Sequence, residues 1–144
     1  MAELLRQWDC PSFLLVGGGS SILAGDPPPD TPGWSCGLGE DNASQRFFLT
    51  PSSLSGSGVA VKGAHILDPR TGAPALRQNR AWVLADTASE SDALSTACMV
   101  LGELELKEVL AQNETWLALL ETNQSARSIG RRVRPIEAHG RRDR

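Results

Sequence analysis

Short apolar runs separated by turn residues occupy the first half of the chain. Residues 2–9 predict the end of an amphipathic helix. The continuous apolar run at 13–16 predicts a buried strand, and 22–24 resume a strand after a glycine-rich turn. Apolar and small residues alternate over 34–38, which is typical of a half-buried strand, and 46–50 predict its neighbour. We therefore expect an antiparallel β-meander in this half.

The second half combines buried strands with helix-period segments. Residues 81–85 predict a buried strand, and Thr87-x-x-Glu90 is a capping box that opens a largely buried helix closed by Gly102. A second amphipathic helix is expected over 103–112 and a last buried strand over 116–120. Together these elements predict an α+β fold, with a mixed or antiparallel sheet packed by helices.

Two segments rich in glycine and serine have open interpretations. Residues 17–21 (GGGSS) predict either a tight turn between strands or a loop whose backbone N–H groups hold a phosphate. Residues 51–58 (PSSLSGSG) have the composition of a flexible linker or of a loop that lines a site. The apolar residues that flank 51–58 favour an ordered strand with a polar face.

A turn signature follows His65 at Asp68-Pro69-Arg70-Thr71-Gly72. Asp68 precedes a proline, and its carboxylate is suited to cap turn N–H groups, so it has a structural explanation as the residue that holds the turn. Arg70 could pair with Asp68 or meet a phosphate. A lone histidine is more often structural than catalytic, but its place beside this turn makes His65 a candidate.

Asp92 and Thr96 lie one turn apart on the predicted helix, so both side chains point the same way. A carboxylate and a hydroxyl on one face offer oxygen ligands for a hard cation such as Mg²⁺. Each also has a simpler explanation, because acids in a first turn favour the helix dipole and Thr96 can bond to a carbonyl one turn earlier. The small polar residues at 89, 91 and 95 favour a wet groove, and hence a site.

Composition narrows the class of protein only a little. The 144 residues fit one domain, and 40% of them are hydrophobic and 22% charged. The net charge of −3 predicts no nucleic-acid partner. The three cysteines are far apart and lack CxxC spacing, which argues against a disulfide framework and a zinc site and favours reduced thiols. No apolar run approaches a membrane span, and the N-terminus lacks the pattern of a signal peptide, which favours the cytoplasm.

Apolar residues nearly vanish after position 121. Residues 127–144 hold seven arginines against two acids. We therefore expect a domain over 1–121 and a basic, disordered tail over 122–144, solvated by default and able to touch a membrane surface or nucleic acid.

Two motifs together resemble the ApbE-type FAD:protein FMN transferase family. They are HILDPRTGAP at 65–74 and DALSTACMVLG at 92–102, in the family's order and spacing. Gly18-Gly19-Ser20 and Ser57-Gly58 resemble the family's Gly-Gly loop and Ser-Gly segment. The resemblance covers roughly residues 1–120, and it implies an α+β fold and an enzyme that splits FAD and transfers FMN to a Thr or Ser hydroxyl of a partner protein with Mg²⁺.

The resemblance also implies roles for individual residues. The metal-binding Asp and Thr of the family fall on Asp92 and Thr96, and its motif histidine falls on His65, as a general base for the acceptor hydroxyl or an acid for the leaving AMP. Contacts to FAD fall on the glycine and serine loops and on the turn after His65: Gly18, Gly19, Ser20, Ser57, Gly58 and Asp68.

The chain matches only the C-terminal part of the family's length. The remaining part supplies much of the flavin pocket, and Val16 stands where the family often has Asn. The chain could therefore be a fragment, one subunit of a split enzyme, or a degenerate homologue. The alternatives to a transferase are a non-catalytic FAD- or nucleotide-binding module and a degenerate homologue that acts in protein interaction. Family members occur on both sides of the bacterial inner membrane, so a periplasmic location is open if an N-terminal part precedes this chain.

Overall fold

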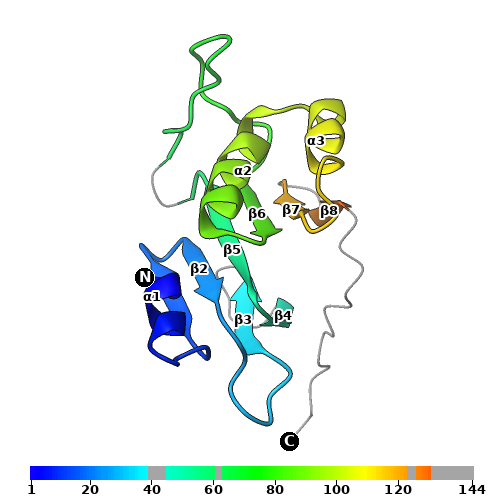
Figure 1. Cartoon of the computed structure of the whole chain (residues 1–144). Helices are drawn as coiled ribbons and strands as arrows, with labels where there is room; N and C mark the ends of the chain where they lie inside the picture. The colour runs from blue at the N-terminus through cyan, green and yellow to red at the C-terminus, as the bar shows by residue number, and fades with distance from the viewer. Residues whose placement is uncertain (39–44, 61–62, 123–125, 131–144) are drawn as a thin grey trace, which may run out of the picture. The chain divides into compact units, whose positions relative to one another are not determined.

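A computed structural model describes residues 1–38, 45–60, 63–122 and 126–130 (Figure 1). Residues 39–44, which link the strands expected over 34–38 and 46–50, lie outside the described residues. The elements are α1 (Ala2–Gln7), β1 (Leu14–Gly17), β2 (Ser21–Ala24), β3 (Trp34–Leu38), β4 (Gln45–Leu49), β5 (Ser52–Gly58), β6 (Arg80–Ala85), α2 (Ala88–Val100), α3 (Glu103–Leu110), β7 (Leu117–Glu121) and β8 (Ala126–Gly130). Among the described residues, strands β1 to β6 follow one another between α1 and α2, and β7 and β8 follow α3, which is the segregated order typical of an α+β fold.

The described strands form a six-stranded sheet in the order β1-β2-β5-β6-β7-β8 and a separate pair, β3-β4. The ladders from β5 to β8 are antiparallel, and β3 pairs antiparallel with β4. The α+β class and the antiparallel pairing are therefore confirmed. The predicted meander is wrong in one respect, because β3 and β4 pair with each other in a sheet of their own and β2 pairs with β5.

The chain divides into two compact units, where the sequence predicts one domain. The N-terminal unit consists of Met1–Leu15 and Ala24–Pro51. The sheet unit consists of Val16–Leu23 and Ser52–Arg132. All residues with a predicted site role lie in the sheet unit. No helix in the described part of the chain is long and apolar enough to span a membrane.

The N-terminal unit confirms some predictions and corrects others. Burial alternates along β3, as predicted, with Cys36 and Leu38 inside. Helix α1 is shorter than predicted and buries none of its residues. The strand predicted at 13–16 is less buried than expected. Phe13 is buried, but β1 becomes exposed toward Gly17. The reason is that β1 is an edge strand of the sheet.

Gly25 makes a close backbone approach that a side chain would prevent. A Cβ at this position would overlap the carbonyl oxygen of Pro11 and lie 2.6 Å from the ring of Phe13. We expect Gly25→Ala to lower the free energy of unfolding by about 1–3 kcal/mol, the usual cost of overpacking. Urea denaturation measures this, with Gly17→Ala as control, since its Cβ would find its nearest neighbour at 3.9 Å. Equal midpoints for the two variants would contradict the prediction.

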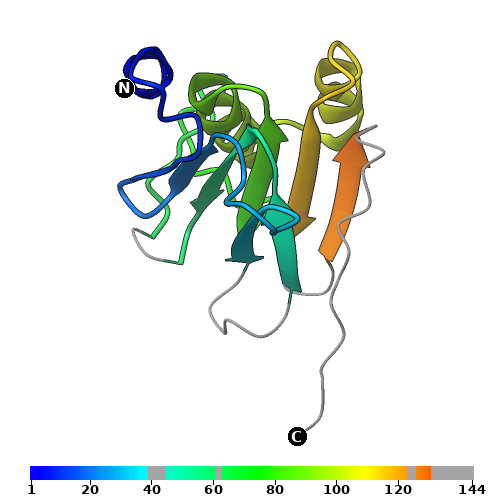
Figure 2. The same ribbon diagram turned by 60° about the horizontal axis from the view of Figure 1, so that its bottom comes forward.

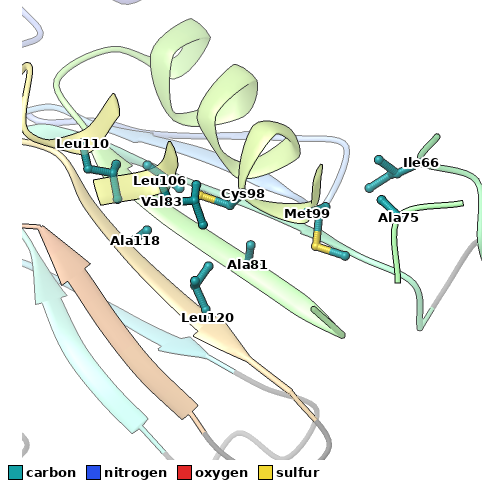
Figure 3. Packing of buried hydrophobic residues seen from close by; sticks show 10 residues of the cluster. All are labelled: Ile66, Ala75, Ala81, Val83, Cys98, Met99, Leu106, Leu110, Ala118 and Leu120. Carbon is teal, nitrogen blue, oxygen red and sulfur yellow. The ribbon is translucent and has the colours of Figure 1, made fainter. Parts of the chain in front are cut away.

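The core of the sheet unit lies between α2 and α3 and the strands beneath them (Figures 2 and 3). Both helices contribute to one cluster with β6 and β7, which is joined by the segment after His65. Its buried members are Ile66, Ala75, Ala81, Val83, Cys98, Met99, Leu106, Leu110, Ala118 and Leu120. The predicted core role of Cys98 is confirmed, and burial raises the pKa of its thiol to about 12. All three cysteines are free.

Helix α2 begins with the predicted capping box. Thr87 Oγ1 accepts from the Glu90 amide at 3.2 Å, and the Glu90 carboxylate accepts from the Thr87 amide at 3.1 Å. The helix ends at Val100 with Leu101 as its C-cap, so it stops directly before Gly102 as predicted, and Gly102 is also the N-cap of α3. Gly102 has an extended backbone, which suits an N-cap, and it does not adopt the left-handed conformation that glycine commonly takes after a helix.

Strand β8 corrects the predicted tail. Ala126–Gly130 pair antiparallel with Leu117–Glu121, so the strand expected to be last has a further neighbour. Arg127 forms an ion pair with Glu103 at 2.7 Å. Backbone pairing does not need apolar side chains, and for this reason hydropathy missed this edge strand. The remainder of the tail, 131–144, lies outside the described residues.

Candidate functional site

The glycine-rich segment between β1 and β2 is a tight turn. Gly18 and Gly19 have φ of 59° and 75°, where glycine is favoured, and the Ser20 amide donates to the Gly17 carbonyl at 3.2 Å. The turn interpretation is confirmed. Contact of Gly18, Gly19 and Ser20 with a phosphate stays a prediction. The carbonyl of Ser20 accepts from the amide of Gly56, so the turn is attached to β5.

Strand β5 confirms the interpretation of 51–58 as an ordered strand with a polar face. Its serines form hydrogen bonds with serines of α2, and we call these residues the serine network. Ser91 Oγ lies 2.7 Å from Ser53 Oγ and 2.8 Å from Ser55 Oγ, and Ser95 Oγ lies 2.9 Å from Ser57 Oγ. Ser53, Ser55, Ser91 and Ser95 are fully buried.

The serine network corrects the prediction of a wet groove. Ser91 and Ser95 were expected to keep water beside α2, and both are inaccessible to it. Their hydroxyls bond to neighbours on β5 and to carbonyls of their own helix, which removes the cost of burying them. Only Ser89 of the three is exposed.

Asp92 and Thr96 are exposed on the part of α2 next to this network. Asp92 Oδ1 accepts from Ser21 Oγ of β2 at 3.3 Å, and Thr96 Oγ1 lies 3.2 Å from Ser57 Oγ of β5. Thr96 also bonds to the Asp92 carbonyl at 3.3 Å, as the simpler explanation predicted. The helix-dipole explanation of Asp92 is weakened, because the acid in the first turn of α2 is Glu90.

These four side chains form an oxygen-only cluster drawn from three elements. No group of three or more His, Cys, Asp or Glu within the described ranges is placed to hold a metal ion. The donors therefore do not fit zinc. They do fit Mg²⁺, which binds through one or two carboxylates and completes its shell with water and substrate phosphate. The ligand chemistry allows this assignment to Asp92 and Thr96, and it stays a prediction.

His65 lies exposed at the start of the segment that joins β5 to β6. Its Nδ1 lies 2.9 Å from the carbonyl oxygen of Gly63. A carbonyl can only accept, so this contact assigns a proton to Nδ1, and in the neutral imidazole the lone pair is then on Nε2. The imidazole is therefore arranged to accept a proton at Nε2.

Asp68 and Arg70 tie this segment to the junction of α2 and α3. Both carboxylate oxygens of Asp68 accept from the Arg70 guanidinium, at 2.9 and 2.8 Å, and Asp68 Oδ1 also caps the Arg70 amide. Arg70 in addition donates to Glu105 at 2.8 Å and to the carbonyl of Val100 at 3.3 Å. Pairing of Arg70 with Asp68 is thus confirmed, and Asp68 is engaged in holding the turn; its predicted contact with FAD stays untested.

The Asp68–Arg70 contact makes this turn sensitive to acid. The hydrogen bonds from Arg70 lower the pKa of Asp68 from 3.8 to about 2. A carboxylate with a lowered pKa stabilises the folded turn above its unfolded pKa and loses that effect as the pH falls through its folded pKa. The Gly72 amide donates to the Asp68 carbonyl, and we expect its protection from hydrogen exchange, measured by NMR against the intrinsic rate at each pH, to fall between pH 4 and 2. Arg70→Gln should shift this transition to higher pH; an unshifted transition would contradict the assignment.

The structure brings together only part of the predicted site. Ser57 joins Thr96, and a residue outside the predicted set, Ser21, joins Asp92. Among described residues, the hydrogen bonds and ion pairs of His65 and Asp68 lie within their own segment, and Arg70 joins that segment to the α2–α3 junction. Gly58 has a packing reason to be glycine, because a Cβ there would lie 2.9 Å from the Asn79 carbonyl oxygen.

Comparison with known proteins places these motifs in one family. The model of the ApbE family matches residues 1–120. The curated FAD:protein FMN transferases of Escherichia coli K12 and of Escherichia coli O157:H7 are each 27% identical over 125 residues. Each alignment covers 76% of this chain and 35% of the relative, so the chain spans about a third of the length of these relatives.

Solved structures show the same fold. The flavin transferase ApbE from Vibrio cholerae superimposes with a TM-score of 0.71 at 23% identity, covering 88% of this chain and 44% of that one. The ApbE protein from Thermotoga maritima gives a TM-score of 0.73 at 22% identity, covering 89% and 46%. At these identities the likeness establishes the fold, which confirms the predicted α+β class as part of an ApbE-like fold.

Proposed function

The chain belongs to the ApbE family, and we propose that it provides part of an FAD:protein FMN transferase. The substrate is FAD, and the acceptor is a Thr or Ser hydroxyl of a partner protein. One observation carries the proposal: in a chain of this family, Asp92 and Thr96 are exposed side by side and each meets a hydroxyl from a strand of the sheet. This cluster is suited to the phosphates of a nucleotide and their counter-ion.

Asp92 and Thr96 hold Mg²⁺ in this proposal, and Ser21 orients the Asp92 carboxylate. When bound, Mg²⁺ neutralises charge on the pyrophosphate. One carboxylate leaves most of the coordination shell to water and phosphate oxygens, which suits an ion that must accompany its substrate.

His65 accepts the proton of the acceptor hydroxyl at Nε2, since its Nδ1 proton is engaged by Gly63. The acceptor oxygen forms a bond to the phosphorus on the FMN side of the pyrophosphate. The bond from that phosphorus to the bridging oxygen breaks, and AMP leaves with the electron pair. The imidazolium can then return its proton to the departing AMP or to solvent.

The loops around the cluster supply the remaining contacts. Gly18 and Gly19 offer backbone N–H groups to phosphate, and Ser20, whose amide is engaged by Gly17, offers its exposed hydroxyl. Ser57 and Gly58 form the end of β5 beside Thr96, and Asp68 holds the turn that follows His65. The partners of the proposal are thus FAD, Mg²⁺ and an acceptor protein.

The experiment that tests the function is a titration of the chain with FAD, followed by flavin fluorescence, with and without Mg²⁺. It is done alone and with the N-terminal part of an ApbE relative added as a second polypeptide, because the chain spans about a third of its curated relatives. Mg²⁺-dependent binding followed by release of AMP supports the transferase. Binding without AMP release in the presence of an acceptor supports a non-catalytic FAD-binding module. Absence of FAD binding both by the chain alone and by the chain with the added N-terminal part contradicts the proposal and supports a degenerate homologue.

A further inference from the structure

A chain of three hydroxyl groups leads from the buried interface of α2 and β5 to the surface. Ser95 Oγ donates to the Asp92 carbonyl oxygen at 2.9 Å. Ser57 Oγ lies 2.9 Å from Ser95 Oγ, and Thr96 Oγ1 lies 3.2 Å from Ser57 Oγ. Ser95 is fully buried, whereas Thr96 is exposed.

The direction of these hydrogen bonds follows from counting protons. A hydroxyl has one proton, and Ser95 gives its proton to a carbonyl, which can only accept. Ser57 must therefore donate to Ser95. With its own proton used, Ser57 can only accept from Thr96, whose proton points to Ser57 or to the Asp92 carbonyl at 3.3 Å. In both cases the Thr96 proton points inward.

We propose that Ser95 is a positioning residue that fixes the Ser57 side chain and thereby turns the lone pairs of Thr96 Oγ1 outward, beside Asp92, as a cation ligand requires. The part of this inference that concerns Mg²⁺ rests on the proposed function. Without the Ser95 hydroxyl, Ser57 has no buried acceptor, and its proton turns to Thr96 Oγ1. Thr96 then accepts a hydrogen bond with the lone pair that would bind the cation.

Ser91 provides a matched control within the same interface. Like Ser95 it is fully buried on α2 and bonds to a carbonyl of its own helix and to β5. Its partners on β5 are Ser53 and Ser55, so it stands outside the chain of hydroxyls that ends at Thr96. Ser91→Ala and Ser95→Ala thus remove equivalent buried hydroxyls, and only the second interrupts the path to Thr96.

The experiment compares the two variants by NMR without metal and by titration with Mn²⁺, a hard cation that takes the same oxygen ligands as Mg²⁺. In Ser95→Ala, the three-bond couplings that report the Ser57 and Thr96 rotamers should change, and the affinity for Mn²⁺ should fall about tenfold, the usual loss when a partner of a metal ligand is removed. In Ser91→Ala, the couplings and the affinity for Mn²⁺ should stay at the wild-type values, although the thermal stability of this variant should fall about as much as that of Ser95→Ala.

Unchanged couplings in Ser95→Ala, or equal changes in both variants, would overturn the inference. If Ser95→Ala does not fold, Ser95→Cys takes its place, because it replaces the oxygen by a weaker sulfur acceptor of similar shape. A wild-type chain that binds no Mn²⁺ would contradict the metal role in the proposed function, and the couplings would still decide whether Ser95 positions Ser57 and Thr96.

Discussion

Replacing Asp92 by Asn is expected to abolish Mg²⁺-dependent binding of FAD while leaving the fold intact. Asp92 is the only carboxylate among the four oxygen side chains of the described cluster, so the neutral amide removes the charge that holds the cation. Loss of several kcal/mol of charge stabilisation corresponds to a fall in affinity of about 100-fold or more. Flavin fluorescence at a fixed Mg²⁺ concentration measures it, with circular dichroism to follow the helix.

The fold should survive because Asp92 is exposed and its amide analogue can still accept from Ser21. Glu108→Gln on α3 is the matched control, since it removes one exposed carboxylate from a neighbouring helix of the same unit. Normal binding of FAD and Mg²⁺ by the Asp92→Asn variant would show that the metal site is elsewhere. Equal losses in both variants would point to overall charge instead of a specific ligand.

Local signals in the sequence were enough to predict the elements that carry these residues. The Thr87 and Glu90 capping box starts α2 where expected, because both partners of a capping box lie within one turn. The turn at Asp68 was also predictable, since Asp before Pro restricts the backbone and Arg70 is two residues away. The motifs at 65–74 and 92–102 identified the family, and the match to the ApbE model confirms it.

Contacts between distant segments were not predictable in the same way. Serine is usually exposed, so hydropathy assigned Ser91 and Ser95 to a wet groove, whereas partners more than 30 residues away on β5 allow their burial. A signal was present: serines at 53, 55 and 57 share one face of a strand, and those at 91 and 95 share one face of a helix. Two polar faces of this kind can satisfy one another.

Pairing between strands explains the other differences between the predicted and the observed structure. The exposure of β1 follows from its place at the sheet edge, and β8 exists because β7 offers it a free edge. Neither fact is encoded in the hydropathy of the strand concerned. Ser21 was missed for a related reason, since its contact with Asp92 joins residues 71 positions apart. The sequence did identify His65 as a candidate, but its catalytic role can be tested only by measuring FMN transfer.

Substituting His65 by Ala is expected to leave FAD binding unchanged and to lower FMN transfer by about 10²- to 10⁴-fold, the range for loss of a general base. His65 is exposed, and its side chain bonds to the carbonyl of Gly63, two residues away, so its removal should alter little of the packed core. The readout is release of AMP from FAD in the presence of an acceptor protein and of the N-terminal part of a relative. Transfer at the wild-type rate would return His65 to a structural role.

Arg77→Gln serves as control, because it changes another exposed polar residue of the segment between β5 and β6. A loss of transfer in both variants would indicate that the segment as a whole is disturbed. A loss confined to His65→Ala, with unchanged exchange of the Gly72 amide, would separate the chemistry of Nε2 from the order of the turn that Asp68 and Arg70 maintain.

The Asp92 and His65 variants together distinguish binding of FAD from transfer of FMN. A chain that needs Asp92 to bind FAD and His65 to release AMP is a transferase component. A chain that needs only Asp92 is a binding module.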